Sequence, residues 1–289
     1  MDRLQNRSVC RPVSAILTLV AVFCGTLAAG ASDSAATGTI VIAGNGPELA
    51  TIERLAGAFE RQHPGAVVDI QWEPASDPIA LLRSGAATFA VAGRAAPELT
   101  VTQIGWDGIA VVVYATHPMR DATLDQLASI FSGQTVGWPD GNGRDSVLHI
   151  LNRPLNQNIR QQFEAALDIV GRIPRGAPIV RSDQEAISTV AGSFSAIAFT
   201  SLKPALQAVE YGVGINLVSV DGVPAASETV RDGRYTLRRP VLLLSRPPLS
   251  AIAAAFAAFT TSPDGQAIVE EAFTTSRADL PLRAAGGAR

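Results

Sequence analysis

The sequence predicts an α/β fold in which helices cover a mostly parallel β-sheet. Between residues 39 and 92, three short apolar runs alternate with two stretches whose apolar residues recur at helical spacing. This strand–helix alternation is typical of a parallel sheet with helices on its faces. The composition agrees, because 47% of the residues are hydrophobic and 17% are charged, as in a globular chain. A length of 289 residues allows one large domain or two lobes.

The remaining elements follow from the same two patterns. Strands are expected where β-branched and other apolar residues cluster, over residues 39–43, 67–72, 88–92, 108–114, 147–151, 196–200 and 240–244. Helices are expected where apolar residues recur three and four apart, over residues 49–62, 78–83, 124–131, 159–167, 184–190, 249–261 and 263–273. Asn45 or Gly46 is the expected cap of the first helix, Asp77 of the second, and Asp183 of the helix that runs to Val190.

The N-terminus predicts a signal peptide over residues 1–31. Three arginines precede an apolar run over residues 13–27, and Ala29-Gly30-Ala31 offers a small-residue cleavage site. An uncleaved membrane anchor is the alternative. Cleavage after Ala31 would remove both cysteines, Cys10 and Cys24, and leave a thiol-free protein in the periplasm.

Composition excludes several classes of function. A net charge of −3 and a pI near 5.7 argue against a strongly basic nucleic-acid binder. His63, His117 and His149 show no metal-ligand spacing, so neither a metal nor another cofactor is expected. No serine stands in a G-x-S-x-G motif, and the mature chain would lack a cysteine nucleophile. The sequence therefore predicts a protein that is not an enzyme, with an exported hydrolase as a minor alternative.

Several segments together resemble the PstS-like phosphate-binding proteins of phosphate ABC transporters, within the type II periplasmic binding proteins. The strongest is residues 106–138, with DGIAVVV (107–113), TLDQL (123–127) and IFSG (130–133). RQQFE (160–164) is similar to the family's R-x-x-F-E helix, and DGRYTLRRP (232–240) to its segment before the return strand. The resemblance covers residues 39–273.

This resemblance implies two α/β lobes with hinge strands and an interlobe cleft. Residues 39–112 with 243–289 would form lobe one, and residues 113–242 lobe two. The strands over 108–114 and 240–244 would cross between the lobes. A ligand would bind in the cleft, at the carboxyl ends of the strands, and closure about the crossing strands would trap it.

The cleft residues can be anticipated from the chemistry of a tetrahedral oxyanion. Such an anion is held by helix N-terminal amides, polar side chains and arginines, and needs no metal. The loop with Asn45 and Gly46 can offer amides, although an ordinary helix cap is the alternative, and it lacks the hydroxyls of the family. Ser76 lies where the family often has a ligand-facing serine. Arg94 ends the third strand, with a solvated surface arginine as the alternative.

The fourth segment of the expected cleft surrounds Arg153. The family carries an arginine four residues before a Ser-Gly-Thr triplet at a helix start, and here Gln157, Asn158 and Ile159 replace that triplet. Gln157 and Asn158 could donate through their side-chain amides. Asp107, which precedes the first crossing strand, is expected to order the hinge rather than to touch the ligand.

The resemblance implies a periplasmic solute-binding protein for phosphate or a related small oxyanion. Its partner would be an ABC permease or another envelope protein, and it is expected to be a monomer. The alternative is a PstS-like module that has lost phosphate affinity and acts as a sensor or adaptor in the cell envelope. The missing hydroxyls around Asn45 and Arg153 motivate this alternative.

Overall fold

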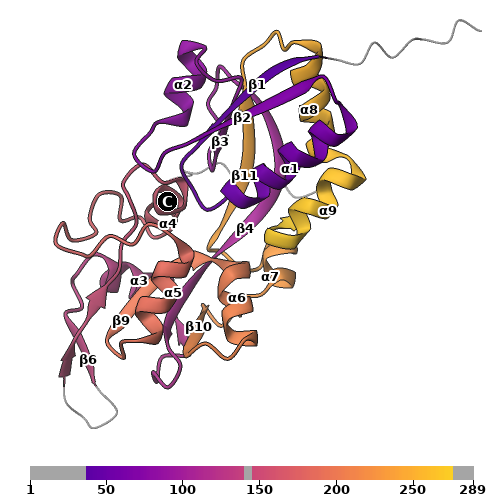
Figure 1. The fold of residues 1–289 in the computed structure, drawn as a ribbon. Coiled ribbons are helices and arrows are strands. Elements are labelled where there is room, and N and C mark those ends of the chain that lie inside the picture. Colours follow the sequence, from indigo (N-terminus) through magenta and orange to yellow (C-terminus); the bar gives the residue numbers. More distant parts are fainter. Residues whose placement is uncertain (1–36, 140–144, 276–289) are drawn as a thin grey trace, which may run out of the picture. The chain divides into compact units, whose positions relative to one another are not determined.

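The computed structural model describes residues 37–139 and 145–275 (Figure 1). The predicted signal peptide, residues 1–31, lies outside the described residues, as do residues 276–289 of the predicted first lobe. Among the helices that are described, none combines the length and the apolar character that a membrane crossing requires.

One part of the main sheet is built from the first three strands and a late strand. Its order is β2-β1-β3-β11-β4, with β1 parallel to β2 and β3, and β11 antiparallel to β3 and β4. The strands are β1 (Gly38–Gly44), β2 (Ala66–Trp72), β3 (Phe89–Ala92), β11 (Arg238–Ser245) and β4 (Thr100–Tyr114). The helices that pack here are α1 (Leu49–Gln62), α2 (Pro78–Ser84), α8 (Ala251–Thr261) and α9 (Pro263–Ala272).

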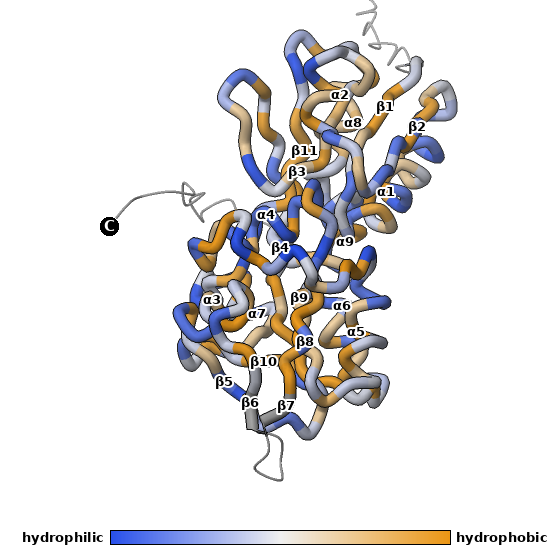
Figure 2. Tube along the Cα trace, turned by 90° about the vertical axis from the view of Figure 1, so that its left-hand side faces the viewer, coloured by the Kyte–Doolittle hydropathy of each residue, from blue (hydrophilic) through white to orange (hydrophobic). Residues whose placement is uncertain are grey.

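Both faces of the sheet are buried at β3 and β11, which explains the continuous apolar runs of these two strands. Alternate residues point to opposite faces. Phe89 and Leu243 pack with Phe59 and Phe256 of α1 and α8, whereas Ala90, Leu242 and Leu244 pack against α2. In Figure 2, the tube beside the β3 and β11 labels is orange, the colour of hydrophobic residues.

The middle of the chain forms a second hydrophobic cluster. Phe163 of α4 stacks on Phe199 of β9 with ring centroids 4.1 Å apart, and Phe131 of α3 meets both rings edge-on. The strands here are β5 (Asp121–Ala122), β6 (Gly137–Pro139), β7 (Asp145–Val147), β8 (His149–Ile150), β9 (Ala196–Ser201) and β10 (Ile215–Val220). The helices are α3 (Leu124–Phe131), α4 (Asn158–Ala166), α5 (Asp183–Ala191), α6 (Leu202–Glu210) and α7 (Ser227–Arg231).

Strand β4 belongs to both parts of the sheet. Up to Gly108 it pairs with β11, and from Ile109 onward it pairs with β9 and β10. The short strand β12 (Thr274–Thr275) also pairs with it, at Trp106 and Gly105. The change of partner lies where the sequence predicts the first crossing strand. The lobe boundaries at 112/113 and 242/243 stay predictions.

The predicted elements are found, but the sheet is mixed rather than mostly parallel, because β11 is antiparallel to β3 and β4, and β4 is antiparallel to β9 and β10. Some elements also differ locally. Strand β4 begins at Thr100 rather than at residue 108, and the strand expected over 147–151 is interrupted at Leu148 between β7 and β8. The elements that were not predicted are helices α6 and α7 and strands β5, β6, β10 and β12. Ser182, not Asp183, caps α5 by accepting from the Glu185 amide. Asp183 is the first helical residue of α5. Its carboxylate accepts hydrogen bonds from the Arg153 guanidinium and from the Ser201 amide instead of capping the helix.

Candidate ligand-binding site

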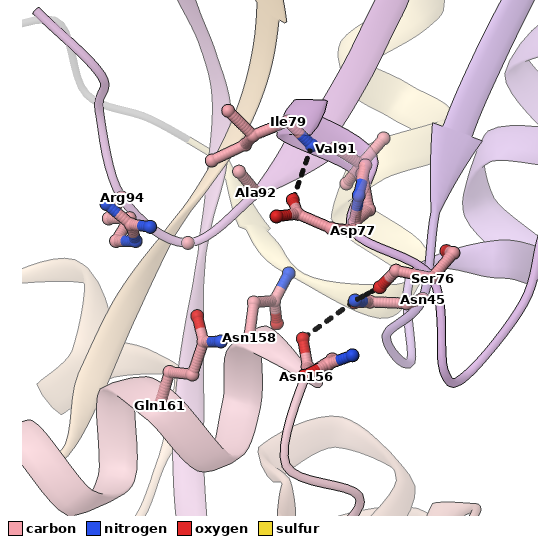
Figure 3. A pocket seen from close by; sticks show the side chains of 12 residues that line it. Asn45, Ser76, Asp77, Ile79, Val91, Ala92, Arg94, Asn156, Asn158 and Gln161 are labelled. Atoms are coloured by element: carbon pink, nitrogen blue, oxygen red, sulfur yellow. Dashed lines mark hydrogen bonds between the residues drawn. The ribbon is translucent and has the colours of Figure 1, made fainter. Parts of the chain in front are cut away.

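A cavity of about 150 Å³ opens where the loops after β1, β2 and β3 approach the start of α4 (Figure 3). We call it the Asn158 cavity. A cavity of this size holds a molecule of about six heavy atoms. Its lining combines polar side chains with a few apolar ones and consists of Asn45, Ser76, Asp77, Pro78, Ile79, Val91, Ala92, Gly93, Arg94, Asn156, Asn158 and Gln161.

Asn45 holds the loops around this cavity together rather than capping α1. Its side chain is buried and donates to the Ser76 carbonyl at 3.0 Å and to the Asn156 carbonyl at 2.7 Å. Asn156 in turn donates to the Ala75 carbonyl at 2.9 Å. The residue at the N-cap position of α1 is Glu48, so the expectation that Asn45 or Gly46 caps this helix is wrong. Asn45 does not cap the helix because its side chain donates to two carbonyls that are distant in the sequence.

Ser76 and Asp77 form one wall of the Asn158 cavity. Asp77 caps α2, accepting from the amides of Ile79 and Ala80 at 3.0 and 3.1 Å, as the sequence predicts. The Ser76 hydroxyl donates to the Glu73 carbonyl at 2.8 Å. A hydroxyl has a single proton, so Ser76 can only accept a further hydrogen bond in this arrangement.

Arg94 provides the positive charge of the Asn158 cavity. It follows the end of β3, is exposed, and lies at the rim in Figure 3. Within residues 37–139 and 145–275, the guanidinium forms neither an ion pair nor a hydrogen bond. Gly93 brings this strand end close to α4, because a Cβ there would lie 3.0 Å from Gln162 Cγ and 3.5 Å from Asn158 Cβ.

Arg153 lies on a different cavity. It lines a second, more open space of about 400 Å³ together with Gly46 and Gln157, and Asn45 lines both cavities. We call it the Arg153 cavity. The predicted site residues therefore divide into two groups. Asn45, Ser76, Arg94 and Asn158 meet at the Asn158 cavity, while Asn45, Gly46, Arg153 and Gln157 meet at the Arg153 cavity.

The polar groups of Arg153 and Gln157 are engaged inside the protein. Arg153 is 1% exposed and donates to Asp183 Oδ1 and to Gln157 Oε1, each at 3.0 Å. Gln157 donates to the Arg181 carbonyl at 3.2 Å. A buried arginine needs such partners, since an unpaired buried charge is strongly unfavourable. The Asp183 carboxylate therefore compensates the charge of Arg153.

Asn158 connects the Asn158 cavity to a buried ionic network that the sequence did not reveal. Its amide nitrogen donates to Glu48 Oε1 at 3.1 Å, and its oxygen accepts from Arg239. Arg239 also donates to Glu48 and, through Nη2, to Asp107 at 2.7 Å. Asp107 further accepts from the Ser201 hydroxyl at 2.8 Å. Asp107 thus links β4, β9 and β11 where β4 changes partner. Its role in ordering a hinge stays a prediction.

Burial controls the ionisation of this network. Burial raises the pKa of Asp107 to about 6, although the Arg239 charge and the Ser201 hydrogen bond oppose the shift. Burial alone would lower the pKa of Arg239, but the carboxylates of Glu48 and Asp107 outweigh it and raise that pKa above its usual value. Arg239 therefore remains charged under all ordinary conditions.

The described part of the chain contains no group of three histidine, cysteine or acidic residues that could hold a metal ion. His63 stacks on Phe59, and His117 packs against Phe194.

The fold and the family profile define a class of protein. The profile of the PBP superfamily domain matches residues 29–264, and the chain belongs to this superfamily of periplasmic-binding-protein-like domains. The fold is that of the type II periplasmic binding proteins, as the sequence predicts.

The relatives confirm the resemblance to PstS. The phosphate-binding protein PstS of Bacillus subtilis is 22% identical over 298 residues, covering 96% of this chain and 95% of its own. A substrate-binding protein from Clostridium perfringens, assigned to a phosphate ABC transporter and crystallised with phosphate, superimposes with a TM-score of 0.73 at 24% identity, covering 83% of this chain and 100% of its own. An ABC-type phosphate transport receptor from Vibrio cholerae gives 0.72 at 23%, covering 82% and 100%.

Proposed function

We propose that this protein is the solute-binding component of an ABC transporter and carries phosphate or a closely related small oxyanion to its permease. The observation that carries this proposal is the Asn158 cavity, which Arg94 lines together with polar side chains and which has space for about six heavy atoms. Among the described residues, the Arg94 guanidinium has neither an ion-pair nor a hydrogen-bond partner. The relatives named for phosphate binding support the same ligand class.

The size of the Asn158 cavity selects small ligands. Its volume of about 150 Å³ is well below the roughly 300–1,000 Å³ of sites for larger organic molecules. A phosphate ion has five heavy atoms and fits, whereas a nucleotide or an oligosaccharide does not. The ligand would be a free oxyanion or one that carries a very small substituent.

The residues around the cavity have distinct proposed roles. Arg94 supplies the charge, and α4 begins at Asn158, so its first amides and the positive end of its dipole would favour an anion there. The exposed Gln161 offers a further side-chain amide. Asn45 and Ser76 shape the wall.

The remaining predicted ligand residues act from the Arg153 cavity. Because Arg153 and Gln157 are bound to Asp183 and to the Arg181 carbonyl, we propose that they position the loop that leads into α4. Gly46 would act in the same way from the loop before α1. Direct ligand contact by these three residues stays a prediction from the resemblance.

Calorimetry with inorganic phosphate, sulfate and methylphosphonate on the mature chain tests the ligand class. We expect micromolar or tighter binding of at least one of these anions, strongest for phosphate. Absence of heat and of any thermal shift with all three would contradict the proposal and favour the sensor or adaptor alternative.

We further propose export through a signal peptide cleaved after Ala31, action as a monomer and no catalysis. N-terminal sequencing of the protein from the periplasm and light scattering of the purified chain test the first two points. An intact N-terminus in the membrane fraction, or a stable dimer, would contradict them. Turnover of phosphate esters would contradict the third.

A further inference from the structure

The carboxylate of Glu48 is buried at the N-terminus of α1. The residue is 0% exposed, and its side chain makes no capping hydrogen bond to the helix. Instead Oε1 accepts from Asn158 at 3.1 Å and from Arg239. These donors come from α4 and β11, more than 100 residues away in the sequence.

The second oxygen of this carboxylate, Oε2, has no hydrogen-bond partner among the described residues. It packs against the loop before α1, where a Cβ on Gly46 would lie 2.3 Å away. A side chain at position 46 would therefore displace this carboxylate. A buried carboxylate with one unsatisfied oxygen is unfavourable on stability grounds alone, so its position invites a functional explanation.

The position of Glu48 resembles that of a bound anion. Bound oxyanions accept charge-assisted hydrogen bonds from side chains that converge on them. Glu48 lies at the N-terminus of α1 and accepts a hydrogen bond from Asn158, the first residue of α4. The Asn158 amide is thereby engaged at both ends, because its nitrogen donates to Glu48 and its oxygen accepts from Arg239.

We propose that the Glu48 carboxylate is an internal anion that competes with the ligand for Asn158 and so weakens oxyanion binding in the adjacent cavity. The inference rests on the proposed function, because it assigns the ligand to the Asn158 cavity. A ligand in the cavity must either share the Asn158 amide with Glu48 or displace the Glu48 carboxylate from it. The negative charge of Glu48 also repels the bound anion. Glu48 is a positioning residue, since it does not line the cavity itself.

Replacement of Glu48 by glutamine tests the effect of the carboxylate charge separately from that of the side-chain shape. The Glu48→Gln variant keeps the shape of the side chain, and Arg239 keeps the Asp107 carboxylate as its ion-pair partner. The matched control is Glu210→Gln, which makes the same charge change at an exposed position on α6. A thermal melt of each variant establishes that it is folded.

Titration calorimetry with inorganic phosphate then gives the outcome. We expect Glu48→Gln to bind about tenfold tighter than wild type, the effect of one charge-assisted hydrogen bond returned to the ligand, and Glu210→Gln to be unchanged. The gain should disappear in Glu48→Gln combined with Asn158→Ala. Unchanged or weaker binding by Glu48→Gln, when wild type binds phosphate, overturns the inference.

The two proposals fail in different ways. If only Glu48→Gln binds phosphate, the internal anion is supported and phosphate transport by the wild-type chain is contradicted. If neither protein binds phosphate, the internal anion is contradicted, and the proposed function is contradicted only if wild type also fails to bind sulfate and methylphosphonate. If Glu48→Gln does not fold, Glu48→Ala replaces it, with the same expected gain and the same contradicting result.

Discussion

The two cavities that meet at Asn45 each have an arginine, and the two arginines differ in what surrounds them. Arg153 is 1% exposed and paired with Asp183, while Arg94 is exposed and forms no ion pair with the residues that the structure describes. An arginine whose charge is already compensated inside the protein stabilises the fold, whereas an arginine without a partner is available to a ligand. The same residue type therefore stabilises the fold at one cavity and, in the proposed function, supplies the charge for ligand binding at the other.

Removal of Arg153 should have the largest effect on stability. Arg153→Ala leaves the Asp183 carboxylate buried without its cation, and such a loss costs about 3–5 kcal/mol. Urea unfolding of Arg153→Ala and of the exposed control Arg172→Ala would measure it. A decrease in the unfolding free energy of less than about 1 kcal/mol, as for an exposed ion pair, would contradict the stabilising role given to Arg153.

The second buried network predicts a pH dependence of stability. Burial raises the pKa of Asp107 from 3.8 to about 6, so between these values the folded state holds a proton that the unfolded chain has released. This contribution to stability is complete below the ordinary pKa and is lost as the pH rises through about 6. Wild type should therefore lose roughly 3 kcal/mol that Asp107→Asn does not lose.

Urea unfolding of both proteins at several pH values from acid to neutral checks this prediction. Contributions from other groups cancel in the difference between the two unfolding free energies. Parallel pH profiles for wild type and Asp107→Asn would show that Asp107 is ionised throughout the range, contrary to the expected effect of burial.

Asn45 contributes to both cavities and should affect stability and binding together. Asn45→Ala removes two hydrogen bonds and leaves the carbonyls of Ser76 and Asn156 without this donor, a loss of about 1–3 kcal/mol. Phosphate affinity should fall several-fold as the shared wall loosens. Asn216→Ala is the control, because that side chain makes one local hydrogen bond in β10. Phosphate binding by Asn45→Ala as tight as that of wild type would show that the wall formed by Asn45 does not contribute to binding.

Much of the fold follows from local sequence patterns. The apolar runs of β1, β3 and β11, together with Asp77 before Pro78, identify elements without any tertiary information. The first part of β4 was missed because TVTQIGWD interleaves polar residues, and its burial comes from pairing with β11. Helix α6 was missed because Pro204 lies near its start, where the first turn tolerates it.

The candidate site was only partly predictable. Ser76 and Arg94 stand after strands, and Asn158 opens a helix, so a parallel-sheet topology brings them to one edge. The contact between Glu48 and Arg239 joins residues 191 positions apart, and no local pattern reveals it. The division of the predicted residues between two cavities likewise depends on side-chain partners such as Asp183.

The affinity for inorganic phosphate of Arg94→Ala, compared with Arg172→Ala, tests the central claim most directly. Both variants remove one arginine, but only Arg94 lines the Asn158 cavity. The loss of a charge-assisted hydrogen bond predicts binding weaker by about tenfold or more for Arg94→Ala, and unchanged for Arg172→Ala. Phosphate binding by Arg94→Ala as tight as that of wild type would contradict the assignment of the ligand to this cavity.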